Sequence, residues 1–268
     1  TNTGLAAGGE SVVITGTGFR TRPVTNARPT VTIDGTSATV TAFSAVNQTI
    51  TVTLPAHVVG LVNVVVTNWD GQTSGSSGNN AFEYVHGAPD HLAITWTSGT
   101  LTTTPNNTTF TSQPIITVQD SYNQTVTSGD GSTADIDVSV NGSPVGVATA
   151  GGTTATAISG VATFTTAKLL GTTGTYKLYF SSASTGMSGV TAISGDIILT
   201  YGAANTLAIN AGNNQSATVN TTVSTAPKVR VTDISGNPVP DVTVAFAVAS
   251  GGGKINVAFI KPVLAGDT

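Results

Sequence analysis

The chain has 268 residues, which at about 100 residues per small sandwich domain indicates two to three domains. Only 8% of the residues are charged, against about 25% in an ordinary soluble domain, and the nine basic residues are scattered singly. This composition excludes a cationic groove for nucleic acid, and the absence of cysteine excludes disulfides and thiolate metal sites.

Runs of alternating apolar and polar residues recur along the chain. Because successive side chains of a strand point to opposite sides of a sheet, such runs predict strands with one buried face. The first clear run covers residues 49–54, residues 135–140 repeat it with acidic residues on the polar side, and residues 241–248 repeat it again. Each run is expected to form a strand of a two-sheet sandwich.

Turn signals lie between these runs, at Asp34-Gly35, Asp70-Gly71, Asn141-Gly142 and Gly236-Asn237-Pro238. These residues supply the positive or fixed φ that tight connections need. Thr and Val favour strands, and helix-forming residues such as Met are scarce. The sequence therefore predicts an all-β fold of immunoglobulin-like β-sandwich modules.

An internal repeat sets the expected domain boundaries. Residues 87–94 (GAPDHLAI) are echoed by residues 202–209 (GAANTLAI), and residues 114–120 (PIITVQD) by residues 227–233 (PKVRVTD). Such self-similarity predicts tandem units of one kind. The expected modules are residues 1–86, 87–202 and 203–268. Because the linkers between them are very short, we expect an extended rod.

Residues 4–85 resemble the IPT/TIG family of immunoglobulin-like domains. The matching residues are Gly8-Gly9 with Val12, Ile14, Gly16 and Phe19, then residues 31–35 (VTIDG), 54–56 (LPA) and 81–85 (AFEYV). The resemblance implies an immunoglobulin-like sandwich. Since the first strand of the family usually precedes the position of Gly4, the module 1–86 is expected to lack that strand.

Residues 203–253 resemble the bacterial immunoglobulin-like repeats of invasin- and intimin-type adhesins. The likeness lies in residues 207–209 (LAI), 212–219 (GNNQSATV), 231–233 (VTD) and 236–239 (GNPV). The module 87–202 is a looser relative. These resemblances imply surface stalks, adhesins or spacers of secreted enzymes, and hence an extracellular or cell-surface location.

The module 203–268 is shorter than its neighbour, and its resemblance to the repeats ends after Gly253. It is therefore expected to be a partial module with a divergent C-terminal strand. Residues 260–268 also look like the opening of an IPT module. One hypothesis joins these features: Lys254 to Pro262 pairs with the first module of a neighbouring molecule, which is strand addition and builds a filament.

The residues proposed for this inter-subunit strand are Ile255, Val257, Phe259, Ile260 and Pro262. The alternative is that the chain is a fragment of a long repeat protein. If strand addition occurs, the partner of the chain is a second copy of itself, bound head to tail.

The sequence offers no catalytic constellation. There is no Gly-x-Ser-x-Gly elbow, no His-Glu-x-x-His helix and no phosphate-binding glycine-rich loop. His57, His86 and His91 are expected to lie apart in solvated loops or at module junctions. No catalytic or cofactor-binding residue is assigned, and the protein is not expected to be an enzyme.

Calcium is the only metal for which the sequence offers candidate ligands, in Asp130, Asp135 and Asp137 and in the pair Glu83 and Asp90 at a module junction. Their spacing does not fit an EF-hand loop. Alternating acids on the solvated face of a strand explain Asp135 and Asp137 without an ion, and we assign no metal site.

Two aromatic residues are candidate ligand contacts. Trp69 and Tyr122 lie at predicted hairpin tips, where exposed rings can stack on a sugar or a partner, although such rings also often fold back onto their own module. Trp96 alternates with Leu92 and Ile94 and is expected in the core.

These observations favour a non-catalytic structural or adhesive protein, a stalk or filament subunit. The alternative is a spacer or carbohydrate-binding region of a secreted polysaccharide-degrading enzyme. The expected partners are a second copy of the chain, or other surface proteins and glycans. No stretch of 18 apolar residues predicts a membrane span.

Overall fold

The computed structural model describes residues 2–23, 25, 27–75, 81–141 and 148–254. In this part of the chain the regular elements are all strands, as the sequence predicts. None of the described segments is a helix long and apolar enough to cross a membrane. The chain divides into two compact units, residues 1–91 with 118–132, and residues 92–117 with 133–268.

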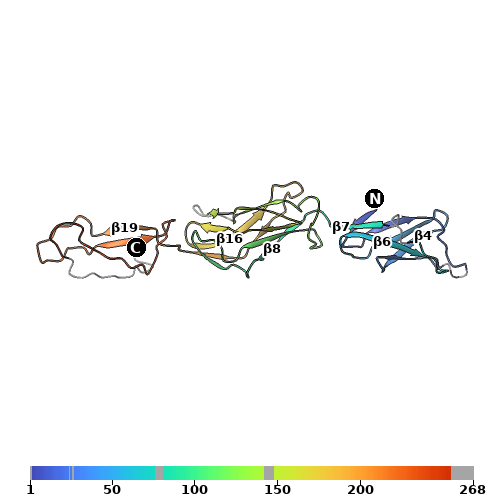
Figure 1. Cartoon of the computed structure of the whole chain (residues 1–268), viewed down its shortest axis with the longest axis horizontal. Coiled ribbons are helices and arrows are strands. Elements are labelled where there is room, and N and C mark those ends of the chain that lie inside the picture. Colours follow the sequence, from blue (N-terminus) through green and yellow to red (C-terminus); the bar gives the residue numbers. More distant parts are fainter. Residues whose placement is uncertain (1, 24, 26, 76–80, 142–147, 255–268) are drawn as a thin grey trace. The chain divides into compact units, whose positions relative to one another are not determined.

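The first seven strands lie within residues 3–85 (Figure 1). They are β1 (Thr3–Leu5), β2 (Ser11–Thr15), β3 (Thr30–Ile33), β4 (Thr36–Ser44), β5 (Thr49–Thr53), β6 (Gly60–Thr67) and β7 (Ala81–Val85). Their order across the sheet is β1-β7-β6-β3-β4-β5-β2. All pairs are antiparallel except β1 with β7, which is parallel.

β4 connects the two halves of this sheet. Its first residues, up to Ala38, pair with β3, whereas its residues from Thr39 onward pair with β5, with a register shift between Val40 and Ala42. A strand that changes partner at an irregularity lets one continuous sheet fold over into two packed layers. The layers enclose a core of buried residues: Ala6, Val31, Ile33, Ala38, Ile50, Val52, Leu54, Val62, Val66, Phe82 and Tyr84.

Two predictions for this region are confirmed. The alternating run 49–54 forms β5, and Ile50 and Val52 are fully buried. The turn signal Asp34-Gly35 joins β3 to β4, with φ of 45° and 79°. Positive φ at both positions is the geometry of a type I′ hairpin turn, which Asp-Gly favours.

The next strands belong to residues 91–200 and form three sheets. They are β8 (His91–Trp96), β9 (Thr103–Pro105), β10 (Pro114–Gln119), β11 (Asp135–Asn141), β12 (Ala148–Ala150), β13 (Thr154–Thr156), β14 (Val161–Thr163), β15 (Lys168–Leu170), β16 (Gly174–Ser181), β17 (Ala192–Ile193) and β18 (Ile197–Thr200). The sheet orders are β14-β10-β8, β13-β11-β16-β18-β9 and β12-β15, and β17 adds to β16.

The predicted strand 135–140 is also confirmed, as β11. Ile136 and Val138 are buried, whereas Asp135 and Asp137 lie on the exposed face. Phe180, the partner of Val138 in the neighbouring strand β16, meets Phe164 edge to face with ring centroids 5.8 Å apart. Alternation therefore predicts the buried face of this strand correctly.

Beyond residue 205 the described residues form only two strands, the antiparallel pair β19 (Thr206–Ala211) and β20 (Lys228–Thr232). The predicted strand at residues 241–248 is wrong, because this segment pairs with no other strand of the described chain. Val242 and Val244 are half-buried, but Phe246 and Val248 are exposed. An alternating pattern provides a buried face, yet a strand also needs a neighbour for its backbone hydrogen bonds.

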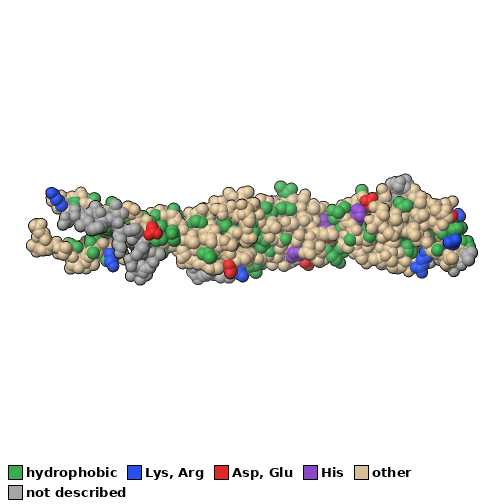
Figure 2. Space-filling view, turned by 90° about the horizontal axis from the view of Figure 1, so that it is seen from below, with side chains coloured by type: hydrophobic (Ala, Val, Ile, Leu, Met, Phe, Trp, Pro, Cys, Tyr) green, Lys and Arg blue, Asp and Glu red, His purple; other side chains and the backbone are tan. Residues whose placement is uncertain are grey.

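The surface is poor in charge, as the composition requires. On the face seen in Figure 2, acidic and basic side chains are few and scattered among uncharged atoms. Large apolar side chains are exposed in the last region, among them Leu207, Ile209 and Val219.

Candidate functional sites: aspartate clasps and an open strand edge

The internal repeat places one buried aspartate directly after β10 in its first copy and directly after β20 in its second. Asp120 follows β10 and is 1% exposed. Its Oδ2 accepts a 2.8 Å hydrogen bond from the backbone N–H of Gly87, the residue that begins the repeat. Its Oδ1 accepts the backbone N–H groups of Tyr122 and Gln124, both at 2.9 Å. We call this arrangement the Asp120 clasp.

Asp233 builds the same arrangement after β20 and is 2% exposed. Its Oδ2 accepts the backbone N–H of Gly202 at 2.9 Å. Its Oδ1 accepts those of Ser235 and Asn237, at 2.9 Å and 3.0 Å. Gly202 stands in the second copy of the repeat where Gly87 stands in the first, so the Asp233 clasp binds the equivalent linker residue.

The Asp233 clasp has further bonds to residues between β9 and β16. The Nδ2 group of Asn106 donates to Asp233 Oδ2 at 2.8 Å, and Asn106 Oδ1 accepts the N–H of Gly171. Asn237 donates to the carbonyl of Gly171 and accepts the N–H of Thr173. Asn106 and Asn237 are both buried. The last repeat is therefore joined to the preceding one by a satisfied polar network.

Glycine is required at position 202 and fits closely at position 87. A Cβ on Gly202 would lie 2.4 Å from the carbonyl oxygen of Asn106, a distance that real contacts do not allow. A Cβ on Gly87 would lie 3.2 Å from the Cβ of Asp120, which is tight. The close approach of the linker backbone to the carboxylate therefore depends on the missing side chain.

The hydrogen bonds keep both carboxylates ionised. Burial would raise the pKa of Asp120, but the N–H donors of Gly87, Gln124 and Tyr122, with the nearby His86, lower that pKa below its ordinary value. Burial likewise acts to raise the pKa of Asp233, and its hydrogen bonds from Asn237, Gly202 and Asn106 outweigh burial and lower it.

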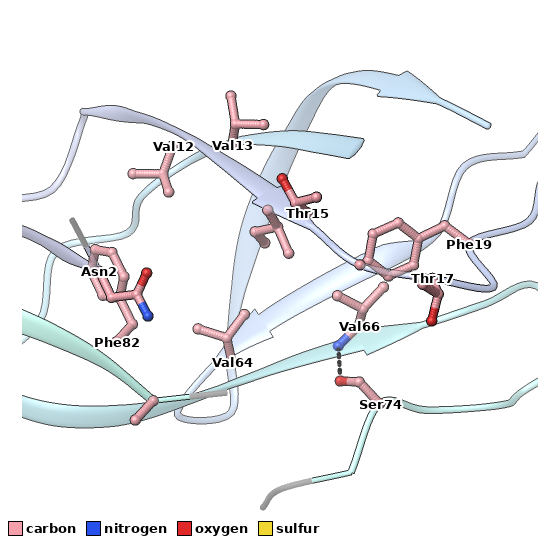
Figure 3. A pocket seen from close by; sticks show the side chains of 13 residues that line it. Asn2, Val12, Val13, Thr15, Thr17, Phe19, Val64, Val66, Ser74 and Phe82 are labelled. Atoms are coloured by element: carbon pink, nitrogen blue, oxygen red, sulfur yellow. Dashed lines mark hydrogen bonds between the residues drawn. The ribbon is translucent and has the colours of Figure 1, made fainter. Parts of the chain in front are cut away.

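The second feature is an open edge of the first sandwich. β2 ends the sheet order, and its only strand neighbour among the described residues is β5. Beside it lies a cavity of about 420 Å³ between β2 and β6 (Figure 3). The apolar residues that line it are Val12, Val13, Ile14, Phe19, Val64, Val66, Ala81 and Phe82, and Asn2, Thr15, Thr17 and Ser74 add polar groups.

The cavity marks a place where the core is incompletely covered. Val12, Ile14, Phe19 and Val64 pack against the buried core but are themselves only partly buried. In Figure 3, Val64 and Val66 of β6 lie across the cavity from β2. The open side therefore exposes an apolar strip of the interior.

The two candidate ligand-contact aromatics are exposed. Trp69 is 46% exposed, and Tyr122 is 55% exposed although its backbone N–H belongs to the Asp120 clasp. Their role in binding stays a prediction. Trp96 is half-buried at the end of β8 rather than fully enclosed in the core.

The three histidines do not lie together in one site, but each contacts neighbouring residues, whereas the sequence predicted solvated side chains. The ring of His57 stacks on Tyr84 with centroids 5.1 Å apart, and its Nε2 lies 3.4 Å from Asp34. His86 is hydrogen-bonded to Ser128, and His91 to Asp90 and Gln119.

The described residues contain no group of three or more His, Asp or Glu side chains placed to hold a metal. Asp135 and Asp137 instead accept hydrogen bonds from the hydroxyls of Thr156 and Thr154 on the adjacent strand β13. This is the solvated-face arrangement that the sequence offered as the alternative to calcium.

The proposed inter-subunit residues Ile255, Val257, Phe259, Ile260 and Pro262 lie outside the described residues. Sequence reasoning missed the roles of Asp120 and Asp233. The signal was present, because both aspartates close the same echoed segment and are followed by turn residues, Asn123 and Gly236, which both have positive φ.

Residues 1–84 match the family model of the IPT/TIG domain. No curated protein sequence matches the chain. Similar solved structures include the adhesin FdeC of Escherichia coli, which is 17% identical with a TM-score of 0.43; the match covers 91% of this chain and 76% of FdeC. InvD of Yersinia pseudotuberculosis is 19% identical with a TM-score of 0.38, over 89% of this chain and 70% of InvD.

A β-glycosidase from Bacteroides vulgatus is 11% identical with a TM-score of 0.31, and the match covers 70% of this chain. The chain spans only 24% of that enzyme's length. The strand pairing, the buried sandwich core and the family match agree on the first module. The chain is thus an all-β, immunoglobulin-like protein whose residues 1–84 match the model of the IPT/TIG domain.

Proposed function

We propose that the chain is a non-catalytic structural or adhesive protein of the cell surface or extracellular space, a stalk segment built of immunoglobulin-like modules. The observation that carries the proposal is the pair of clasps. In each, a buried aspartate binds the backbone N–H of the glycine that begins its repeat. A linker held in this way restricts bending between modules, which a stalk requires.

The chemistry of the described residues agrees with such a role. Buried polar side chains such as Asn106, Gln113 and Asn237 are all hydrogen-bonded within the protein. In the described interior these polar groups therefore stabilise the fold. An active site needs a nucleophile paired with a general base, and neither the cavity beside β2 nor a second one, lined by residues between Tyr179 and Thr191, contains such a pair.

Small-angle X-ray scattering tests this proposal. The full chain is compared with a variant that carries a flexible Gly-Ser segment inserted after His86. If the chain is a stalk, the insertion should widen the range of distances between the first module and the rest of the chain, because it separates that module from the linker glycine Gly87.

A second function is favoured by the exposed rings. Trp69 and Tyr122 offer flat aromatic faces to solvent, and such faces can stack on sugar rings. On this reading the chain is a spacer or carbohydrate-binding region of a secreted polysaccharide-degrading enzyme. Binding of glycans that depends on these two rings distinguishes the second function from a bare stalk.

A further inference from the structure

We propose that the cavity beside β2 is an acceptor site for Lys254 to Pro262 of a second copy of this chain, which adds to the first module as an extra strand. The inference rests on the proposed stalk function and gives the stalk a partner, another stalk. Three features support it: the open edge of β2, the apolar lining of the cavity, and the sequence of residues 254–262, which we call the tail.

β2 is an edge strand, and the backbone groups on its outer side can pair with an added strand. Gly16 N–H donates to the carbonyl of Gln48 on the strand side that faces β5. Hydrogen-bonded pairs alternate along an antiparallel ladder, so Ile14 and Val12 also direct their backbone groups toward β5. The backbone groups of Ser11, Val13 and Thr15 therefore face the open edge, where no described strand meets them.

The cavity then sets the chemistry of the added strand. Its lining from β2 and β6 is aliphatic apart from Thr15, and Phe19 and Phe82 lie at its two ends (Figure 3). The neighbouring polar groups include Ser74, whose Oγ accepts the backbone N–H of Val66 and is thus already engaged. A strand laid along β2 buries every second side chain here, so these side chains must be apolar.

The tail of the chain has this pattern. From Lys254 the sequence reads Lys-Ile-Asn-Val-Ala-Phe, so Ile255, Val257 and Phe259 fall on one side of an extended strand and the polar Lys254 and Asn256 on the other. Two of the other alternating runs, in β5 and β11, already pair with strands on both sides.

The segment before the tail allows it to leave its own module. Gly251, Gly252 and Gly253 follow one another, and a Cβ added at any of them would meet no atom within 4 Å. Three successive glycines in open space form a flexible connection. Residues 241–248 also alternate and lack a strand partner, but they precede this connection, and Val242 and Val244 are half-buried in their own module.

The first experiment measures binding of a fluorescent peptide of residues 254–262. The receptor is the full chain with Val257→Asp and Phe259→Asp, which prevents its own tail from competing. Fluorescence anisotropy is expected to show saturable binding with one peptide per chain. A peptide of residues 241–249 is the matched control and is expected not to bind.

Val13→Pro tests the edge itself. Proline removes the N–H that faces outward and leaves the bonds between β2 and β5 in place, and Val13 is 59% exposed, so the fold is expected to survive. In the receptor this substitution should weaken peptide binding about tenfold or more. Val13→Thr keeps the N–H and should bind normally. Circular dichroism melting curves verify that each variant is folded.

Assembly provides an independent arm. Sedimentation of the unchanged chain is expected to show association that grows with concentration, whereas the tail variant and Val13→Pro each remain monomeric. Mixing these two variants should give a one-to-one dimer and nothing longer, because one supplies only the acceptor and the other only the donor.

The proposal is overturned if the 254–262 peptide does not bind, if the 241–249 peptide binds equally well, or if folded Val13→Pro binds as tightly as Val13→Thr. A mixture of the two variants that forms no dimer also overturns it. None of these outcomes changes the scattering result for a single chain, so failure of strand addition is distinguishable from failure of the stalk.

Discussion

The carboxylate of Asp233 accepts the backbone N–H of Gly202 at 2.9 Å, and this single bond joins the end of one strand pair to the start of the repeat that contains it. The bond recurs between Asp120 and Gly87. Because both carboxylates are buried and accept several N–H groups, they stabilise the linker as charged hydrogen-bond acceptors.

Asp233→Asn is expected to destabilise the protein by about 2–3 kcal/mol, because an amide NH2 would then face groups that themselves donate. Asp233 accepts bonds from Asn106, Ser235 and Asn237 as well as Gly202. Chemical unfolding followed by circular dichroism measures the change. Exposed Asp241, replaced by Asn, is the control. Equal stability of the two variants would contradict the role of the clasp.

Acid is expected to weaken both clasps. The pKa values of Asp120 and Asp233 are lower in the folded protein than the ordinary value, so their ionisation contributes stability that is fully present above about pH 4. This stability is lost as pH falls through the lowered values. The melting temperature should therefore fall below about pH 4, and less steeply when both residues are Asn. An unchanged acid dependence in the double variant would refute this origin.

Gly202→Ala should destabilise the protein by about 1–3 kcal/mol, because the new methyl group would collide with the carbonyl oxygen of Asn106. Gly195→Ala is the matched control, since a Cβ there meets no atom within 4 Å. The control should change stability by no more than about 0.5 kcal/mol. Thermal melting of the two variants side by side checks the difference.

Glycan binding decides between the two functional readings. If the exposed rings bind sugars, Trp69→Ala and Tyr122→Ala should each weaken retention on a glycan array by about tenfold, since stacking on a ring is lost. Both residues are exposed, so neither change should unfold the protein. Retention that is unchanged in both variants removes these rings as ligand contacts.

The sequence predicts local features of this fold well. Alternation placed Ile50 and Ile136 in buried positions, and Asp34-Gly35 marked a hairpin turn. Both signals depend on neighbouring residues alone. The run at 241–248 has the same alternation but forms no strand, because pairing depends on a partner that a local pattern does not specify.

The sites were harder to predict because they depend on contacts between segments that are far apart in the sequence. Asp120 and Asp233 were visible as repeated residues, but their burial and their bonds to Gly87 and Gly202 arise only when distant segments meet. The exposure of Trp69 followed from its place in a turn. His57, placed in solvent by its loop position, packs on Tyr84 instead, because a loop can lie against its own core.

Small-angle X-ray scattering from the full chain shows whether the clasps hold the linkers. We expect the unchanged chain to have a narrow range of distances between its modules, and we expect a Gly-Ser segment inserted after His86, or Asp120→Asn, to widen that range. If the range is as wide in the unchanged chain as in the insertion variant, the clasps do not hold the linkers.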